Sequence, residues 1–110
     1  MRLYLDVNAD RVNYIVAVNG QSSLAFGTSA SCPTFASLVN MINARRLNAK
    51  KSGFLNPTPY ANPLVLNDVT IGSNRGCGTK GFTAVPGWDW VTGLRTPSFP
   101  AMLELFMGLP

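Results

Sequence analysis

A serine between a predicted strand and a predicted helix is the residue of this chain best suited to covalent chemistry. Ser29 follows Gly27 and Thr28, and residues 27–36 read Gly-Thr-Ser-Ala-Ser-Cys-Pro-Thr-Phe-Ala. The first N–H groups of a helix have no partner within the helix, and they give its N-terminus a partial positive charge. Such a position suits a serine oxygen that gains negative charge during acyl transfer. The chain has no histidine, so its 110 residues supply no imidazole base.

Helix capping is the alternative role for the same hydroxyl groups. The side-chain oxygen of Ser29 or Thr28 can accept a hydrogen bond from an N–H group of the first turn. The longer pattern favours chemistry, because Gly27 permits a sharp turn of the backbone. In addition, the small Ala30 and Ser31 leave room for a substrate backbone.

The chain has few carboxylates, which limits its acid–base and metal chemistry; they are Asp6, Asp10, Asp68, Asp89 and Glu104. Asp6 and Asp10 are four residues apart, the spacing of an acid–base pair on a helix. Their segment has no convincing helical pattern, so structural or surface roles are expected for both. Glu104 lies in a predicted helix and is expected to be solvated.

Asp68 and Asp89 are the candidate metal ligands. Each lies in a turn-rich segment, residues 67–70 and 85–89 respectively, beside main-chain carbonyls. Calcium takes six or more hard oxygen ligands, commonly carboxylates and carbonyls, and it tolerates irregular loops. Turn stabilisation and helix capping are the alternative roles of these two side chains.

The composition indicates one domain or part of one. Hydrophobic residues make up 46% of the chain, which is enough to form a core, while charged residues make up only 13%. The net charge of +4 includes one cluster at the expected end of a helix, where the helix dipole favours cations: Arg45, Arg46, Lys50 and Lys51. No basic stripe alternates with aromatic residues, so nucleic-acid binding is not expected.

The sequence predicts neither a membrane span nor a signal peptide. No apolar run is long enough to cross a membrane, and Asp6 interrupts the first residues. The two cysteines are a weak sign of the cellular compartment. Cys32, in the first turns of a helix, is expected to be a buried thiol. Cys77, in a glycine-rich loop, is more typical of a disulfide partner, either for Cys32 or for a cysteine outside these 110 residues, and the sequence leaves open whether either cysteine is bonded.

A β-hairpin and an amphipathic helix are predicted for the first half of the chain. Residues 13–18 and 21–26 are rich in β-formers, and Asn19-Gly20 between them is typical of a two-residue hairpin turn. The helix is expected to end near residues 47–49. Pro33 is expected in its first turn, where an N–H group has no intrahelical acceptor. One apolar stripe at helical spacing faces the core, formed by Phe35, Leu38, Val39 and Ile42.

Loops and short elements are predicted for the second half. The Pro/Gly/Asn loop over residues 52–62 carries one helical turn near residues 57–60. Residues 64–70 are expected to form a short buried strand. Residues 72–81 are too rich in glycine for regular structure, and Pro86-Gly87 is a turn signal.

The last predicted helix begins after Ser98, its expected N-cap, and stops at Gly108. The residues on its apolar side are Leu103, Phe106 and Met107. The order of strands and helices indicates the α/β class. The chain is too short, however, to form a sheet with helices on both faces, so the sequence predicts an incomplete α/β fold.

Several further segments match, in order, the motifs of one peptidase family. Besides residues 27–36, these are residues 53–57 (Gly-Phe-Leu-Asn-Pro), 67–72, 86–89 (Pro-Gly-Trp-Asp), 91–94 (Val-Thr-Gly-Leu) and 96–100 (Thr-Pro-Ser-Phe-Pro). Together they resemble the C-terminal part of the sedolisins, the acid-acting serine-carboxyl peptidases that include fungal tripeptidyl-peptidases. An ordinary subtilisin shares only the Gly-Thr-Ser segment, so the later motifs distinguish the two families.

The resemblance implies a role for each matching residue. Ser29 corresponds to the nucleophile, and Asp68 and Asp89 correspond to the carboxylates that bind a calcium ion. The positions whose main-chain carbonyls bind the same ion are Val69, Val85 and Gly87. In the family the base is a glutamate held by an aspartate, and a second, protonated aspartate donates to the oxyanion. A carboxylate base works at acidic pH, which accounts for a chain without histidine.

The glutamate and both of these aspartates belong to family segments that precede the matched one. We therefore expect residues 1–110 to be the C-terminal portion of a sedolisin-type catalytic domain, with a subtilisin-like three-layer α/β fold that is incomplete. Without its catalytic acids, the chain is expected to be inactive alone. The resemblance further implies peptide or protein substrates and an extracellular location, and it leaves the oligomeric state open.

A non-enzymatic calcium-binding remnant or interaction module is the alternative. Three departures from the family pattern favour it: Phe26 replaces a small residue before the nucleophile segment and is expected to crowd it, Trp90 replaces proline, and Arg95 replaces glycine. An ordinary subtilisin fragment, with its histidine elsewhere, is a third possibility, which residues 86–89 disfavour.

Overall fold

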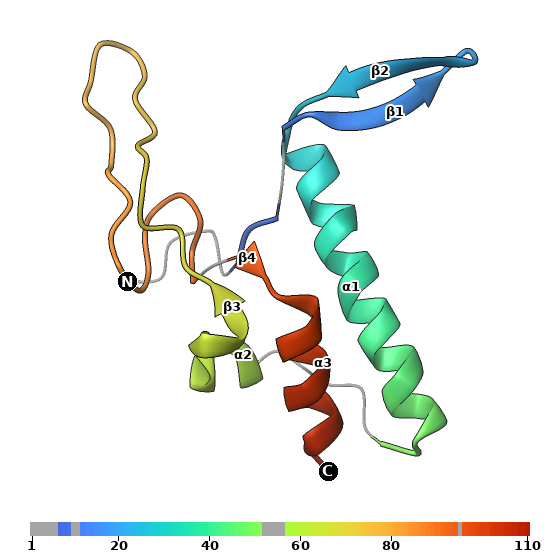
Figure 1. The fold of residues 1–110 in the computed structure, drawn as a ribbon. Helices are drawn as coiled ribbons and strands as arrows, with labels where there is room; N and C mark the ends of the chain where they lie inside the picture. The colour runs from blue at the N-terminus through green and yellow to red at the C-terminus, as the bar shows by residue number, and fades with distance from the viewer. Residues whose placement is uncertain (1–6, 10–11, 52–56, 95) are drawn as a thin grey trace.

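The computed structural model describes residues 7–9, 12–51, 57–94 and 96–110 (Figure 1). The predictions for Asp6, Asp10, Arg95 and residues 52–56 lie outside the described residues. Helices and short strands are mixed along the chain, in agreement with the predicted class at this level. The radius of gyration of 16.0 Å exceeds the value of about 13 Å expected for a compact domain of this length. No helix among the described residues has the length and hydrophobicity needed to span a membrane.

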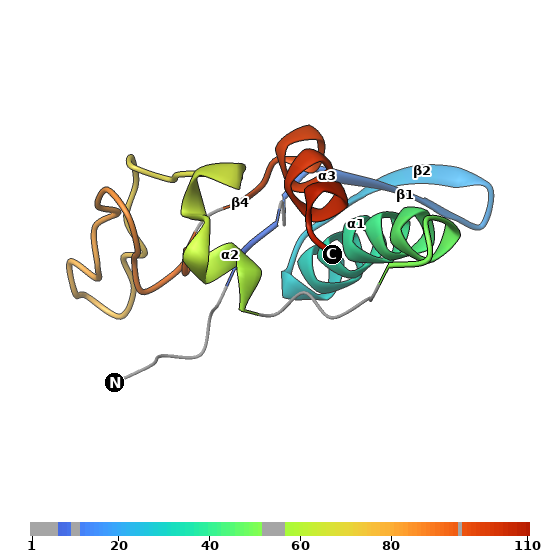
Figure 2. The same ribbon diagram turned by 90° about the horizontal axis from the view of Figure 1, so that it is seen from below.

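The predicted β-hairpin is confirmed. β1 (Tyr14–Val18) and β2 (Gln21–Ala25) pair in antiparallel fashion around the turn Asn19-Gly20. Both turn residues have positive φ, 52° and 78°, as a type I′ turn requires. In Figures 1 and 2 the hairpin projects from the N-terminal end of the long helix that follows it.

α1 (Thr28–Asn48) is the longest element, and only part of its predicted stripe is deeply buried. Ile42 is fully buried and Phe35 packs against the same core. Leu38 and Val39 are half-buried. The apolar contact of α1 therefore concentrates in its C-terminal half.

Two predictions for the first turns of α1 are wrong. Because the helix begins at Thr28, Pro33 lies beyond the first turn, so the main-chain oxygen of Ser29 lacks the N–H donor that normally comes from four residues ahead. Cys32 is exposed rather than buried, since Ser31 takes the buried position of this turn.

The second half of the chain contains shorter elements. α2 (Thr58–Ala61) confirms the predicted helical turn. The strand predicted over residues 64–70 is mostly wrong, because Pro63–Val65 form the 3-10 helix η1 and only Leu66–Asn67 form strand β3. A proline has the fixed φ that suits the start of a helical turn. β3 pairs in antiparallel fashion with β4 (Thr96–Pro97).

α3 (Phe99–Gly108) completes the core. It runs beside α1 in both ribbon views (Figures 1 and 2). Its buried residues are Met102 and Phe106, so the predicted apolar side is correct at Phe106 but misses Met102. Ser98 is the N-cap by position, yet its side chain makes no capping hydrogen bond. Glu104 is exposed, as predicted. The core cluster consists of Ile42, Leu66, Met102 and Phe106.

Two cations at the end of α1 hold the C-terminal end of α3. Arg46 is 2% exposed, and its guanidinium donates to the main-chain oxygens of Phe106, Leu109 (3.4 Å) and Pro110 (2.7 Å). The Lys51 ammonium donates to the oxygens of Met107 (2.6 Å) and Leu109 (2.7 Å). The last carbonyls of a helix have no intrahelical donor and carry partial negative charge. These two cations therefore act on the neighbouring helix, not only on their own.

Replacing Arg46 by methionine should destabilise the chain by about 2–4 kcal/mol, because buried carbonyls at the end of α3 then lose charged donors. Arg45→Met is the matched control: Arg45 is exposed, so its loss should cost less than about 0.5 kcal/mol. Urea unfolding followed by circular dichroism measures both. Equal losses of stability in the two variants would contradict the role given to Arg46.

Candidate functional site

Ser29 lies in the first turn of α1 with its hydroxyl available. The N-cap of the helix is Gly27, with φ 126° and ψ 163°, a conformation that a residue with a side chain rarely adopts. No side chain caps the helix, so the prediction that Ser29 or Thr28 forms the cap is wrong. Among the residues that the structure describes, none forms a hydrogen bond with the Ser29 hydroxyl. The start of the helix therefore has no side-chain cap, and the Ser29 hydroxyl is not used as one.

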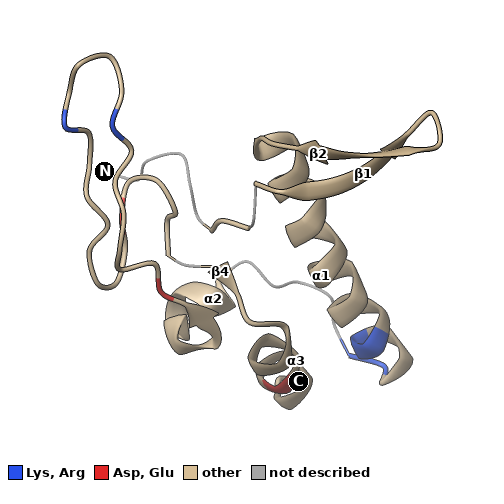
Figure 3. Cartoon of the chain, turned by 45° about the horizontal axis from the view of Figure 1, so that its top comes forward, with Lys and Arg blue, Asp and Glu red and all other residues tan. Residues whose placement is uncertain are grey.

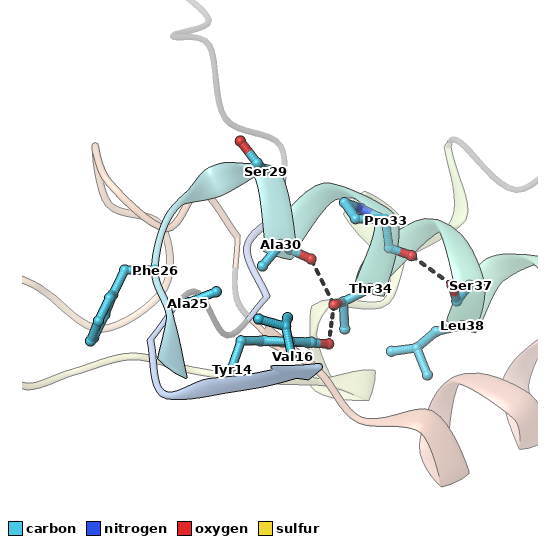
Figure 4. Close-up of a pocket in the computed structure, with 10 residues that line it drawn as sticks. All are labelled: Tyr14, Val16, Ala25, Phe26, Ser29, Ala30, Pro33, Thr34, Ser37 and Leu38. Carbon is cyan, nitrogen blue, oxygen red and sulfur yellow. Dashed lines mark hydrogen bonds between the residues drawn. The ribbon is translucent and has the colours of Figure 1, made fainter. Parts of the chain in front are cut away.

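An open cavity of about 540 Å³ lies between the hairpin and the first turns of α1 (Figure 4). Most of its lining is apolar, including Val16, Phe26 and Leu38. The hydroxyl of Thr34 donates to the Ala30 oxygen (2.7 Å), so its hydrogen bond with the Tyr14 hydroxyl has Tyr14 as donor. The polar groups of this cavity therefore mostly bond to each other.

The Ser29 hydroxyl points away from the other residues that line this cavity, as Figure 4 shows. Phe26 also stands apart from it and is 67% exposed, so the expected crowding of the nucleophile segment by Phe26 is not observed. Ser31, expected to leave room for a substrate, instead anchors the first turn: its hydroxyl donates to the Ala9 oxygen at 2.9 Å and is buried. Ser29 is therefore exposed, while hydrogen bonds hold the nearby hydroxyls of Ser31 and Thr34.

The two candidate calcium loops meet. The N–H group of Gly87 donates to Oδ2 of Asp68 at 2.8 Å, which joins residues 67–70 to residues 85–89. Val69 and Asp89 line one cavity of about 100 Å³. The remaining carbonyl position, Val85, is 48% exposed. The structure therefore brings together the two loops that sequence motifs paired, although they are far apart along the chain.

Asp89 is buried, and its carboxylate stabilises its own turn. Oδ1 accepts hydrogen bonds from the N–H groups of Val91 (2.9 Å) and Thr92 (3.0 Å), and Oδ2 accepts one from the Thr92 hydroxyl (2.6 Å). Burial by itself raises the pKa of Asp89, but these hydrogen bonds outweigh it and leave the pKa below its ordinary value. The carboxylate is therefore kept charged within a rigid loop.

Thr92 is a site residue that the sequence reasoning missed. The spacing Asp-x-x-Thr was the available signal, because an aspartate often accepts hydrogen bonds from residues two and three positions ahead in a turn. The main-chain groups of Asp89 and Gly93 also bond to each other, at 3.0 and 3.1 Å. This closed turn explains why the aspartate is buried although it lies in a loop.

The donor set suits calcium in type. Two carboxylates on adjoining irregular loops offer hard oxygens, and main-chain carbonyls lie beside both. Within the described ranges, no group of three or more His, Cys, Asp or Glu side chains is present. A calcium ion held here would therefore depend on main-chain oxygens as much as on carboxylates, which agrees with the carbonyl positions that the resemblance implies.

Trp90, one of the departures from the family pattern, packs against other aromatic rings. It stacks on Phe82 with ring centroids 4.9 Å apart and an interplanar angle of 18°. It also meets Trp88 edge-on, with centroids 5.9 Å apart. The tryptophan is thus accommodated beside Asp89 without displacing the turn that holds the carboxylate.

Comparisons with known proteins identify relatives whose alignments cover nearly the whole chain. No family model matches it. It is 52% identical to Tripeptidyl-peptidase sed1 of Aspergillus fumigatus and 51% identical to Aorsin of Aspergillus oryzae, in each case over 99% of this chain and 17% of the relative. Tripeptidyl-peptidase 1 of Bos taurus is 41% identical over 96% of this chain and 20% of its own length. The chain therefore spans about a fifth or less of these relatives, and it is homologous to a C-terminal part of the sedolisin family of peptidases.

Proposed function

We propose that this chain is the part of a serine-carboxyl peptidase that carries the nucleophile, and that Ser29 is that nucleophile. The observation that carries the proposal is the free Ser29 hydroxyl at the uncapped start of α1, in a segment within the 52% identity to a tripeptidyl-peptidase. A serine that capped its own helix would have its oxygen engaged. The glycine N-cap removes that competition, and the helix start favours the negative charge that develops in acyl transfer.

The proposed reaction is hydrolysis of a peptide bond through an acyl-enzyme. The Ser29 oxygen attacks the carbonyl carbon of the substrate and loses its proton to a base. The C–N bond then breaks and the amine leaves with that proton. Water next attacks the ester, which releases the acid and restores the Ser29 hydroxyl. By resemblance the base is a glutamate, held by an aspartate, from family segments outside the matched one. No described group forms a hydrogen bond with the hydroxyl. Since the base comes by resemblance from another segment, we propose that the chain alone does not activate Ser29.

The extended shape supports a role within a larger α/β domain of the subtilisin-like, three-layer type. The two named sheets have only two strands each, and large apolar side chains of the hairpin are exposed, with Ile15 at 73% and Leu24 at 57%. Exposed apolar surface of this kind is normally covered in a folded domain. The substrates proposed are peptides or proteins, and the location proposed, by resemblance alone, is extracellular.

We further propose a structural calcium site at the joined loops, with Asp68 and Asp89 as carboxylate ligands. Main-chain oxygens of Val69, Val85 and Gly87 would complete it. Such an ion neutralises two carboxylates on adjoining loops and holds those loops together. Its role would be to stabilise this end of the molecule, not to take part in bond cleavage.

A non-enzymatic calcium-binding module is the second candidate function. It is favoured by the departures from the family pattern at Phe26, Trp90 and Arg95. In that case the same calcium site remains, while the serine has no catalytic role. The two candidates differ in the reactivity of Ser29.

Substituting this chain for the matching segment of Tripeptidyl-peptidase sed1 tests the nucleophile. The chimera should cleave peptide substrates at acidic pH, and Ser29→Ala should lower kcat by roughly a thousandfold or more. Ser37→Ala is the matched control, because this exposed serine only donates to the Pro33 oxygen (2.7 Å) on the same helix. Its activity should stay within a few-fold of the parent.

The chain alone should cleave no peptide and should not react with a fluorophosphonate probe. Turnover by the isolated chain that Ser29→Ala abolishes would overturn the expectation of inactivity. A chimera that folds but is inactive, or whose activity survives Ser29→Ala, would favour the non-enzymatic module.

Calcium titration by calorimetry tests the metal site. Asp68→Asn and Asp89→Asn should each weaken calcium binding by roughly tenfold or more, since each removes a charged oxygen ligand. Glu104→Gln is the control, because Glu104 is an exposed carboxylate on α3, and it should bind calcium like the unmodified chain. Bound calcium should also raise the melting temperature. Unchanged affinity in both aspartate variants would show that the site is assigned wrongly.

A further inference from the structure

Residues 72–84 form a ribbon that projects on the side of the molecule opposite α1 in both ribbon views (Figures 1 and 2). At its base the N–H group of Ala84 donates to the oxygen of Gly72 at 2.9 Å. At its tip Gly76 and Thr79 form a bridge around Cys77-Gly78, whose φ values of 49° and 73° are typical of a type I′ turn. No helix or named strand lies in this ribbon, as predicted for residues 72–81, and its two arms are joined only by isolated bridges and single hydrogen bonds.

A bulge at Gly81 sets which side chains share a face of the ribbon. Gly81 has φ 63°, and a Cβ atom there would lie 2.3 Å from the main-chain oxygen of Asn74. The Asn74 side chain also accepts a hydrogen bond from the N–H group of Phe82 at 2.6 Å. Ser73 and Thr83 form the next bridge beyond this bulge. The extra residue brings Thr83 to the same face as Lys80, although the two are three residues apart.

Two cations oppose each other on this face. Arg75 and Lys80 are the residues adjacent to the Gly76–Thr79 bridge, so they lie directly opposite across the ribbon, where like charges are destabilising. Figure 3 shows the two cationic positions on facing sides of the ribbon. Residues 72–84 include no Asp or Glu, and in the part of the chain that the structure describes neither cation has an ion-pair partner. The ribbon thus holds two positive charges close together, and no described acidic side chain neutralises them.

Hydroxyl groups complete the same surface. Arg75 and Lys80 line an open cavity of about 400 Å³ together with Ser73, Thr79 and Thr83. The Thr79 hydroxyl already donates to the main-chain oxygen of Gly76 (2.8 Å), which leaves the hydroxyls of Ser73 and Thr83 as donors. With a guanidinium and an ammonium, these two hydroxyls offer more hydrogen bonds than one carboxylate can accept. They match the oxygens of a tetrahedral anion, which arginine binds with two parallel N–H groups and lysine binds as a point charge.

We propose that this face of the ribbon, formed by Ser73, Arg75, Lys80 and Thr83, binds a tetrahedral oxyanion such as sulfate or phosphate. The anion offsets the repulsion between the two opposed cations, and the Gly81 bulge presents both hydroxyl-bearing edges to it. The site shares no residue with the proposed nucleophile or with the proposed calcium ligands, although Ser73 also lines the cavity beside Val69 and Asp89.

NMR titration of the full ¹⁵N-labelled chain with sodium sulfate tests the site, with ionic strength held constant by sodium chloride. Amide signals of residues 73–83 should shift in a saturable way. Arg75→Gln combined with Lys80→Gln should weaken binding by roughly fivefold or more, since both charged donors are lost. The matched control removes two exposed cations elsewhere, at the end of α1, by Arg45→Gln and Lys50→Gln, and it should leave the titration unchanged.

A thermal melt gives a second readout that does not depend on resolved amide signals. In chloride, Arg75→Gln should raise the melting temperature or leave it unchanged, because it relieves the repulsion, and it should lose the extra stabilisation that sulfate gives the unmodified chain. Sulfate also stabilises folded proteins in general, so the comparison is between this variant and Arg45→Gln. Shifts that grow linearly with sulfate, or equal sulfate responses in the ribbon variants and the α1 variants, would overturn the proposal.

Discussion

The buried contact between the Arg46 guanidinium and the end of α3 is the interaction on which the placement of the two longest helices depends. The apolar core is small, with Ile42 from α1 and Met102 and Phe106 from α3 at its centre. A core of this size defines the angle between two helices only loosely. Directed hydrogen bonds from Arg46 to Phe106 in the last turn of α3 and to Pro110 just beyond the helix add the missing geometric definition, and Lys51 adds a bond to Met107. Arg46 and Lys51 therefore fix the position of α3 along α1, which apolar contacts alone would define less well.

The same helix is fixed at its other end by groups that leave Ser29 alone. Ser31 bonds to Ala9, and Thr34 bonds to Ala30 and Tyr14, so these hydroxyls anchor the first turns. Gly27 provides the cap conformation without a side chain. A sequence optimised only for stability would place a capping serine or aspartate at this position. The hydroxyls of Ser31 and Thr34 thus support the first turns of the helix. Ser29, which the family resemblance marks as the nucleophile, has no described hydrogen-bond partner for its hydroxyl.

Local signals in the sequence predict the first half of the fold well and the second half less well. Asn19-Gly20 determines its own turn through backbone preferences, and the helix after it is predicted in the right place, although only Phe35 and Ile42 of its predicted stripe reach the core. The strand over residues 64–70 fails because Pro63 starts a helical turn and because β3 exists only through pairing with Thr96–Pro97, a distant segment. The burial of Arg46 and the exposure of Cys32 also depend on which side α3 and residues 7–9 occupy. No periodicity within α1 contains that information.

In the candidate site too, some features follow from local sequence patterns and others depend on contacts between distant segments. That Asp68 and Asp89 belong together is predictable only by comparing family motifs, since they are separated in sequence and neither loop has a periodic pattern. What the structure adds is the means: the Gly87 N–H group bridges to Asp68, and Thr92 holds the neighbouring Asp89 in a closed turn. The hydrogen bonds that lower the pKa of Asp89 also fix the direction of its oxygens before any ion binds. A metal that binds such a preset carboxylate orders few additional groups, so the turn chemistry of Asp89 and its proposed role as a calcium ligand reinforce each other rather than compete.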